Sequence, residues 1–166
     1  MVLWKGMRAY FFCNQYLAGI HNGIQSGHAL NLLWPKYIND KDQLATLLDF
    51  SVNHQTWICL NGGDHGMLQD LYFFMQDQKT YPFTVFQEPG LNNANTAVVI
   101  ILPERMYDDH ARMVGRAVLK SETDKLNPGN IPAQIRDDQF QEFMNRHYTP
   151  WELEFLKRKE LCGKAS

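Results

Sequence analysis

The amino-acid sequence predicts an α/β protein: a three-layer sandwich in which helices flank a four-stranded mixed sheet, followed by a helical C-terminal extension. Two observations carry this prediction. Short apolar runs typical of buried strands alternate with segments whose apolar residues recur at helical spacing, an order characteristic of α/β layers. The last two apolar runs are separated only by the polar loop 88–95, which favours a hairpin and therefore an antiparallel strand pair.

The first strand and helix form the central unit of this fold. Residues 8–13 are an apolar run, typical of a strand that is covered on both faces and therefore central in its sheet. Gly19 then permits backbone angles that a side chain would resist. The next segment predicts a helix from about residue 20 to Trp34, because Pro35 disfavours a helical conformation in the residue before it.

On this helix, His21, Gln25 and His28 share one stripe. Ligands of open α/β sheets bind at the carboxyl ends of the strands, so a stripe that faces this edge would line a binding site. The alternative is that His21 and Gln25 are solvated polar residues and that His28 is a hydrogen-bonded core histidine. Gly23 and Gly27 each destabilise the helix by roughly 1 kcal/mol relative to alanine. Either packing holds this helix in place, or the glycines are present because a binding site requires them.

The remaining elements of the main domain follow from the same periodicities. A helix is expected over 40–50 with Asp40 or Asp42 as its N-cap, and another over 65–77 with Asp64 as its N-cap. The other predicted elements are strands over 56–61, 83–87 and 96–102 and a helix over 104–119.

The C-terminal part begins after residue 120, so the predicted division is a main domain over 1–120 and an extension over 121–166. Breakers such as Pro128 and Gly129 indicate a linker over 121–137. Two amphipathic helices follow over 138–147 and 150–161, the second with Thr149 as N-cap and Pro150 at its first position. Their apolar residues either pack on the main domain or form a face for a second copy or a partner protein.

Composition describes an ordinary soluble domain with 45% hydrophobic and 20% charged residues. The net charge of −2 disfavours extensive binding to a nucleic-acid backbone, although Arg105, Arg112 and Arg116 are spaced to share one helix face. Cys13 and Cys59 lie in apolar runs and are expected to be buried and reduced, which suits the cytoplasm. No apolar run is long enough for a membrane span, and no signal peptide is recognisable.

The segment HNGIQSGHA, residues 21–29, resembles the A-A-Q-x-S-H-A helix start of the second, archaeal and eukaryotic class of peptidyl-tRNA hydrolases. Three residues match as they stand: Gln25, His28 and Ala29. Gly27 stands where the family usually has serine, and His21 where it has a functional lysine. The stretch is also similar to an uncharacterised bacterial family of the same fold. The resemblance covers residues 7–118, and the family's element order is similar.

The loop 88–95 extends the resemblance, because those hydrolases carry D-A-G-x-T-Q between their last two strands, beside the first helix. Here Glu88 replaces the aspartate and Gly90 matches. Asn92 and Asn93 stand where threonine and glutamine are expected, and the loop is shorter than the family's. The resemblance therefore implies the family's architecture with different chemistry at the site.

The function implied is hydrolysis of the ester between a peptide and a tRNA 3′ end, or of a related nucleotide ester. This chemistry needs an activated water and donors to an oxyanion. The expected catalytic residues are His21, Glu88 and Asn92. The expected substrate-binding residues are Gln25, His28, Gly90, Asn93 and Asn95. No cofactor is expected, and no metal either, because His21 and His28 lie about 10 Å apart along the helix.

Two other functions are consistent with the sequence. The first is a binding protein on the same fold that holds a nucleotide, an RNA end or a protein without chemistry, which the changes at the family positions favour. The second is a structural or regulatory protein that acts through its C-terminal helices, possible partners being another protein or a second copy in a homodimer.

Overall fold

A computed structural model of the chain describes residues 6–107 and 137–166. The chain divides into two compact units, Met1–Glu104 with Cys162–Ser166, and Arg105–Leu161. The predicted boundary near residue 120 and nearly all of the predicted linker lie outside the described residues. No helix in the described part of the chain is long and apolar enough to cross a membrane.

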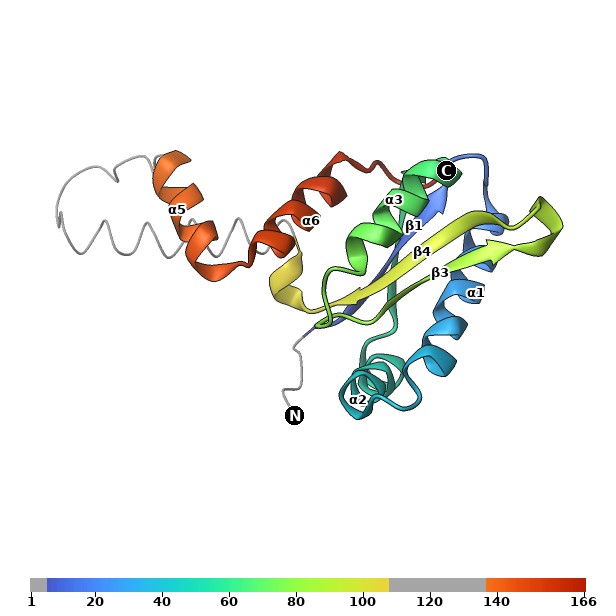
Figure 1. The fold of residues 1–166 in the computed structure, drawn as a ribbon, viewed down its shortest axis with the longest axis horizontal. Coiled ribbons are helices and arrows are strands. Elements are labelled where there is room, and N and C mark those ends of the chain that lie inside the picture. The colour runs from blue at the N-terminus through green and yellow to red at the C-terminus, as the bar shows by residue number, and fades with distance from the viewer. Residues whose placement is uncertain (1–5, 108–136) are drawn as a thin grey trace, which may run out of the picture. The chain divides into compact units, whose positions relative to one another are not determined.

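The first unit is built on a four-stranded mixed sheet in the order β2-β1-β4-β3, which confirms the predicted α/β class (Figure 1). The strands are β1 (Arg8–Asn14), β2 (Thr56–Gly63), β3 (Phe83–Glu88) and β4 (Ala94–Leu102). Strands β1 and β2 are parallel, whereas β4 runs antiparallel to both β1 and β3. The predicted central strand and hairpin are therefore both present.

Helices cover both faces of this sheet. Helices α1 (Ile20–Tyr37) and α2 (Lys41–Asp49) pack on one face, where Leu33 and Leu47 share a core cluster with Phe11. Helix α3 (His65–Met75) lies on the other face, where Leu68 is fully buried (Figure 1). Because side chains alternate along a strand, Phe11 and Phe12 enter different cores.

Both predicted helix caps in this unit are present. The Asp40 side chain accepts a hydrogen bond from Gln43 N at 3.1 Å, and Asp64 accepts one from Met67 N at 3.0 Å. A π-helical turn η1 (Phe50–His54) follows α2. These caps were predictable because each acts within three residues of its own helix.

The predicted end of the first helix at Trp34 is wrong, since α1 continues through Pro35 to Tyr37. The structure shows why an extra turn is stable. Lys36 Nζ donates to Phe83 O at 2.6 Å, and the Tyr37 hydroxyl donates to the same oxygen at 3.2 Å. Contacts with the edge strand β3 thus offset the helical hydrogen bond that proline cannot donate.

Strands β2 and β4 are each two residues longer than predicted, and each contains an irregularity. Strand β2 runs on to Gly63, and β4 begins at Ala94. The pairing skips Gly62 opposite the Cys13–Asn14 step of β1, and it skips Thr96 opposite the Phe86–Gln87 step of β3. At each bulge the extra residue has no partner on the neighbouring strand, so the regular alternation of side chains between the two faces is interrupted there.

The segment 162–166 was predicted as part of the extension, but it pairs with the edge strand β2 in the first unit. Asn61 N donates to Gly163 O at 2.7 Å, and Ala165 N donates to Cys59 O at 3.2 Å. The segment therefore covers part of an edge that would otherwise expose unpaired backbone groups.

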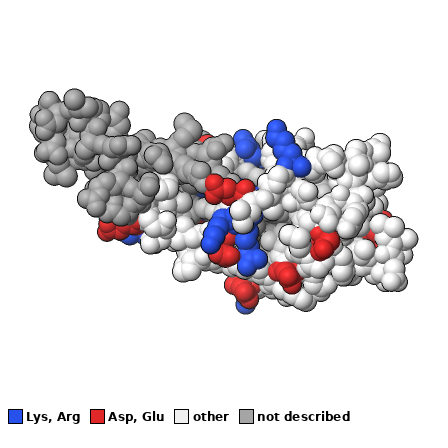
Figure 2. All heavy atoms as spheres, turned by 90° about the horizontal axis from the view of Figure 1, so that it is seen from above, with Lys and Arg blue, Asp and Glu red and all other residues white. Residues whose placement is uncertain are grey.

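Charged side chains are mixed rather than segregated on the face drawn in Figure 2. Lys and Arg lie among Asp and Glu there, and much of the surface carries no charge. This distribution agrees with the net charge of −2. It offers no continuous basic track for a nucleic-acid backbone on that face of the described residues.

The second unit contains helices α5 (Asp137–His147) and α6 (Pro150–Leu161), which confirms the two predicted C-terminal helices. Residues Glu104–Met106 form a short 3-10 helix, η3, at the start of the predicted helix 104–119. The rest of that helix, with Arg112 and Arg116, falls outside the described residues.

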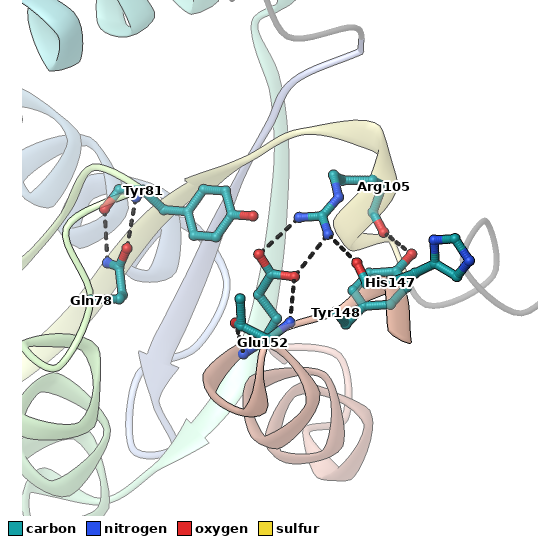
Figure 3. Close-up of polar contacts among 7 residues, drawn as sticks. Gln78, Tyr81, Arg105, His147, Tyr148 and Glu152 are labelled. Atoms are coloured by element: carbon teal, nitrogen blue, oxygen red, sulfur yellow. Dashed lines mark hydrogen bonds and ion pairs between the residues drawn. The ribbon is translucent and has the colours of Figure 1, made fainter. Parts of the chain in front are cut away.

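The start of α6 is a capping box that also binds an arginine. Glu152 N donates to Thr149 Oγ1 at 3.2 Å, and Thr149 N donates to Glu152 Oε2 at 3.4 Å. Arg105 donates to both oxygens of the same carboxylate, at 2.8 and 2.9 Å (Figure 3). Glu152 thus holds the helix start and Arg105 together.

Replacing Glu152 by alanine is expected to lower the free energy of unfolding by about 2 kcal/mol, because a cap and an ion pair with a buried carboxylate are lost together. The Glu152 side chain is 8% exposed, but Arg105 is 45% exposed, so solvent screening limits the loss. Denaturant unfolding followed by circular dichroism would measure it. Glu152→Gln keeps a capping side chain and should cost less; an alanine variant as stable as the native protein would contradict the prediction.

Candidate functional site

The site predicted from the sequence lies where the carboxyl end of β1, helix α1 and the β3–β4 hairpin meet. Helix α1 packs across the sheet because Ala29 and Leu33 are fully buried on its inner face. Gln25 lies one turn before Ala29, is also buried, and points toward the hairpin. Gln25 is therefore buried, so the alternative interpretation of this residue as a solvated polar side chain is wrong.

The Gln25 amide is held on both sides. Thr96 Oγ1 donates to Gln25 Oε1 at 2.6 Å, and Gln25 Nε2 donates to Glu88 Oε2 at 2.8 Å. Thr96 is the bulge residue of β4, and the bulge turns its side chain toward α1. The orientation of the Gln25 amide is set by Glu88, because an ionised carboxylate only accepts hydrogen bonds and therefore faces the amide nitrogen. The Thr96 hydroxyl also lies 3.3 Å from Phe86 O.

The Glu88 carboxylate is anchored at both oxygens. Gln25 donates to one oxygen, and Gly90 N donates to the other at 3.1 Å. The hydrogen bond from Gln25, followed by that from Gly90, lowers the pKa of Glu88, and the nearby charge of His28 contributes in the same direction. The carboxylate is therefore ionised at neutral pH and suits an orienting or charge-stabilising role.

Two exposed histidines flank Gln25 on helix α1. His21 lies one turn before it and His28 one turn after it. The His28 side chain is exposed, and its ring packs against Phe86 with ring centres 4.8 Å apart. It is therefore not the hydrogen-bonded core histidine of the alternative interpretation. The His21 side chain forms no hydrogen bond or ion pair with any residue that the structure describes, Glu88 included.

The tip of the hairpin carries the two predicted asparagines. Residues Pro89–Leu91 form a short 3-10 helix, η2, and Asn92 and Asn93 follow with φ of 53° and 57°. Asparagine tolerates this left-handed conformation better than most residues do. Asn93 N donates to Glu88 O at 3.0 Å, while both side chains are exposed and available to a ligand.

Asn95 lies on the other face of the sheet, away from the group around Gln25. Its backbone N donates to His65 Nδ1 at 2.8 Å, and its carbonyl accepts from Asn14 Nδ2 at 2.9 Å. Its side-chain oxygen accepts from Gln87 at 3.1 Å. Asn95 is 2% exposed, so these contacts tie the start of β4 to β1 and α3.

The amino end of α1 is occupied by the C-terminal segment. Gly19 N donates to Ser166 O at 3.1 Å, and Asn22 Nδ2 donates to the same oxygen at 2.5 Å. The positive end of the helix dipole is therefore already paired with a carbonyl. A ligand at this site would meet the His21–His28 stripe rather than the helix end.

The structure thus brings together Gln25, Glu88 and Gly90 by direct hydrogen bonds, with His28 and Asn93 beside them. It leaves His21 and Asn92 exposed nearby and separates Asn95. Sequence reasoning missed Thr96, because a threonine in an apolar run reads as an ordinary strand residue and a bulge leaves no local signal. No cluster of three metal-binding side chains exists within residues 6–107 and 137–166.

Comparison of the sequence with models of protein families gives no match, and comparison with curated proteins gives none either. The site must therefore be interpreted from its own geometry.

Proposed function

We propose that this chain is an ester hydrolase of the peptidyl-tRNA type, acting on the bond between a peptide and a tRNA 3′ end or on a related nucleotide ester. The observation that carries the proposal is the hydrogen bond between Gln25 and Glu88. It joins the two segments, 21–29 and 88–93, that separately resemble the second class of peptidyl-tRNA hydrolases. The strand and helix order of the first unit is also compatible with that resemblance.

The site contains the groups that such a reaction needs. A water molecule attacks the ester carbonyl, and an imidazole of His21 or His28 accepts its proton. The bond between the carbonyl carbon and the ribose oxygen then breaks, and the imidazolium returns the proton to that oxygen. The Glu88 carboxylate, which Gln25 and Gly90 hold beside this helix stripe, stabilises the imidazolium that forms. The exposed amides of Asn92 and Asn93 are the candidate donors to the developing oxyanion.

The test is incubation of purified protein with N-blocked aminoacyl-tRNA, followed by separation of the released blocked amino acid. We expect the native protein to release the blocked amino acid. One of the two variants His21→Ala and His28→Ala should release none, and that variant identifies the base. His54→Ala is the matched control, because His54 is not part of the proposed site. It lies in the turn after α2, where it pairs with Asp49. Full activity in the double variant His21→Ala/His28→Ala would exclude an imidazole base.

The second candidate is a binding protein that holds the same kind of ligand without cleaving it. Both Glu88 oxygens already accept hydrogen bonds from the protein, which favours this function. The same preparations distinguish the two. If folded protein retains tRNA in a filter-binding assay but releases no amino acid, the site binds without hydrolysis.

A further inference from the structure

The segment 162–166 pairs with the outer edge of β2 as an antiparallel strand, with Leu60 opposite Lys164. The two hydrogen bonds that join it to β2 run between main-chain atoms, so they depend little on its sequence. Its Ala165 side chain packs against the core cluster between α1 and the sheet. Cys59 on this edge is only partly buried, so the prediction that it is buried is wrong, because the segment covers an edge strand incompletely.

The end of the segment is held by two donors at the amino end of α1. Gly19 N and Asn22 Nδ2 both donate to Ser166 O, at 3.1 and 2.5 Å. The Ser166 hydroxyl donates to Leu17 O at 3.3 Å. The edge of β2 thus binds an extended main chain while the start of α1 binds one of its carbonyl groups, which is how proteins recognise peptides by strand addition.

The segment leaves part of this site unused. Asn22 is 5% exposed, yet its Oδ1 atom accepts no hydrogen bond from any residue in 6–107 or 137–166. A buried acceptor without a donor is unfavourable, so the site favours an occupant with an N–H group beside the carbonyl that Asn22 Nδ2 binds. An amide carries both groups, and the asparagine amide is complementary to it.

Two exposed apolar side chains flank the same site. Tyr16 is 82% exposed and Ile20 is 76% exposed, and in the chain they lie next to Leu17 and Gly19. A Cβ atom at Gly19 would meet no atom within 4 Å, so this side of the helix start is open. Exposed apolar side chains beside unused polar groups are typical of a surface that another protein covers.

We propose that the outer edge of β2 and the amino end of α1 bind an extended peptide segment of a partner protein, and that residues 163–166 occupy this site as an internal competitor. The main chain of the partner pairs with β2, and a small apolar residue takes the place of Ala165. An amide of the partner takes the place of Ser166 on Gly19 and Asn22. Binding at this site does not depend on hydrolysis of an ester.

The test uses the full chain with the substitution Ala165→Asp, which puts a carboxylate against the core cluster and releases the segment from β2. Faster hydrogen exchange of the Asn61 amide shows the release, because that amide donates to Gly163 O. If the amide stays protected, Ala165→Pro replaces this variant, since proline also lacks the N–H group that donates to Cys59 O. The spread of the amide signals in the NMR spectrum confirms that the variant is folded.

The probe is the peptide acetyl-Gly-Lys-Ala-Ser-amide, whose terminal amide offers a carbonyl oxygen and an N–H group to Asn22. In the released variant we expect the probe to shift the NMR signals of the Gly19 and Asn61 amides and of the Asn22 side chain. Half-saturation of the native protein should need about tenfold more peptide or higher, because its own segment competes at a millimolar effective concentration. The matched peptide acetyl-Gly-Lys-Asp-Ser-amide should cause no shifts, because its carboxylate would face the core cluster.

A further substitution in the released variant tests the role of Asn22. Asn22→Asp removes the donor, while an acidic residue suits the first turn of a helix, so the fold is retained. Binding of the probe should be lost. Binding that survives this substitution, equal shifts with both peptides, or no shift in the released variant would overturn the proposal.

Sedimentation velocity of the native protein distinguishes a partner protein from a second copy of the chain. We expect no dimer that depends on the segment. A native dimer that Ala165→Asp abolishes would assign the site to the segment of a second copy and overturn the assignment to a partner protein.

Discussion

Replacing Glu88 by glutamine is expected to lower the rate of hydrolysis of N-blocked aminoacyl-tRNA by about 100-fold or more, the usual contribution of a positioned acid–base pair. The substitution removes the negative charge that stabilises a neighbouring imidazolium. It also brings an amide N–H group against one of the two donors that now hold the carboxylate, Gln25 Nε2 and Gly90 N. Both effects would act on the proposed attack of water on the ester.

Glu88→Asp is the matched variant, because it keeps the charge and supplies the residue found in the family that the loop resembles. It should retain measurable turnover, although the shorter side chain must give up one hydrogen bond. Single-turnover rates at saturating protein separate loss of chemistry from loss of substrate binding. Equal rates for Glu88→Gln and the native protein would show that the carboxylate has no part in the reaction.

Replacing Gly62 by alanine is expected to lower the free energy of unfolding by about 3 kcal/mol, at the upper end of the usual cost of overpacking. A Cβ atom there would lie 2.5 Å from Leu68 Cδ2, 2.9 Å from Phe12 Cβ and 3.0 Å from the Phe12 carbonyl carbon. Leu68 can rotate, but the backbone of the central strand β1 cannot move without disturbing both cores. Urea unfolding would measure the change.

The control for this variant is the same substitution in α1. A Cβ at Gly23 would meet no atom within 4 Å, and the residue is exposed in a helix interior. Gly23→Ala should therefore stabilise the protein by about 0.5–1 kcal/mol, through helix propensity alone. Opposite signs at the two glycines are the expected result; similar stability changes at both would contradict the packing at Gly62.

Local sequence signals determined the secondary structure. The apolar run at residues 8–13 gave the central strand, since two-sided burial leaves no room for polar alternation. Asp40, Asp64 and Thr149 begin helices, because a cap acts through a hydrogen bond within its own first turn. The short loop after Glu88 gave the hairpin and the mixed sheet, because the chain cannot cross a sheet in so few residues.

Tertiary contacts decided the features that local rules cannot reach. Helix α1 passes Pro35 because Lys36 and Tyr37 bind a strand more than forty residues away along the chain. The bulges at Gly62 and Thr96 depend on how two strands pair, and a bulge has no signature in either strand alone.

The candidate site shows the same division. The sequence alone determined that His21, Gln25 and His28 share one helix stripe, because the helical period fixes their relative positions. Only the tertiary structure decided that Gln25 turns inward to Glu88 and that Asn95 faces α3, because the bulge at Thr96 reverses which side chain faces which layer. Only the tertiary structure also brings Ser26 Oγ to 3.5 Å from Cys13 Sγ and 3.9 Å from Cys59 Sγ, because the register of β1 and β2 is not encoded in any single segment.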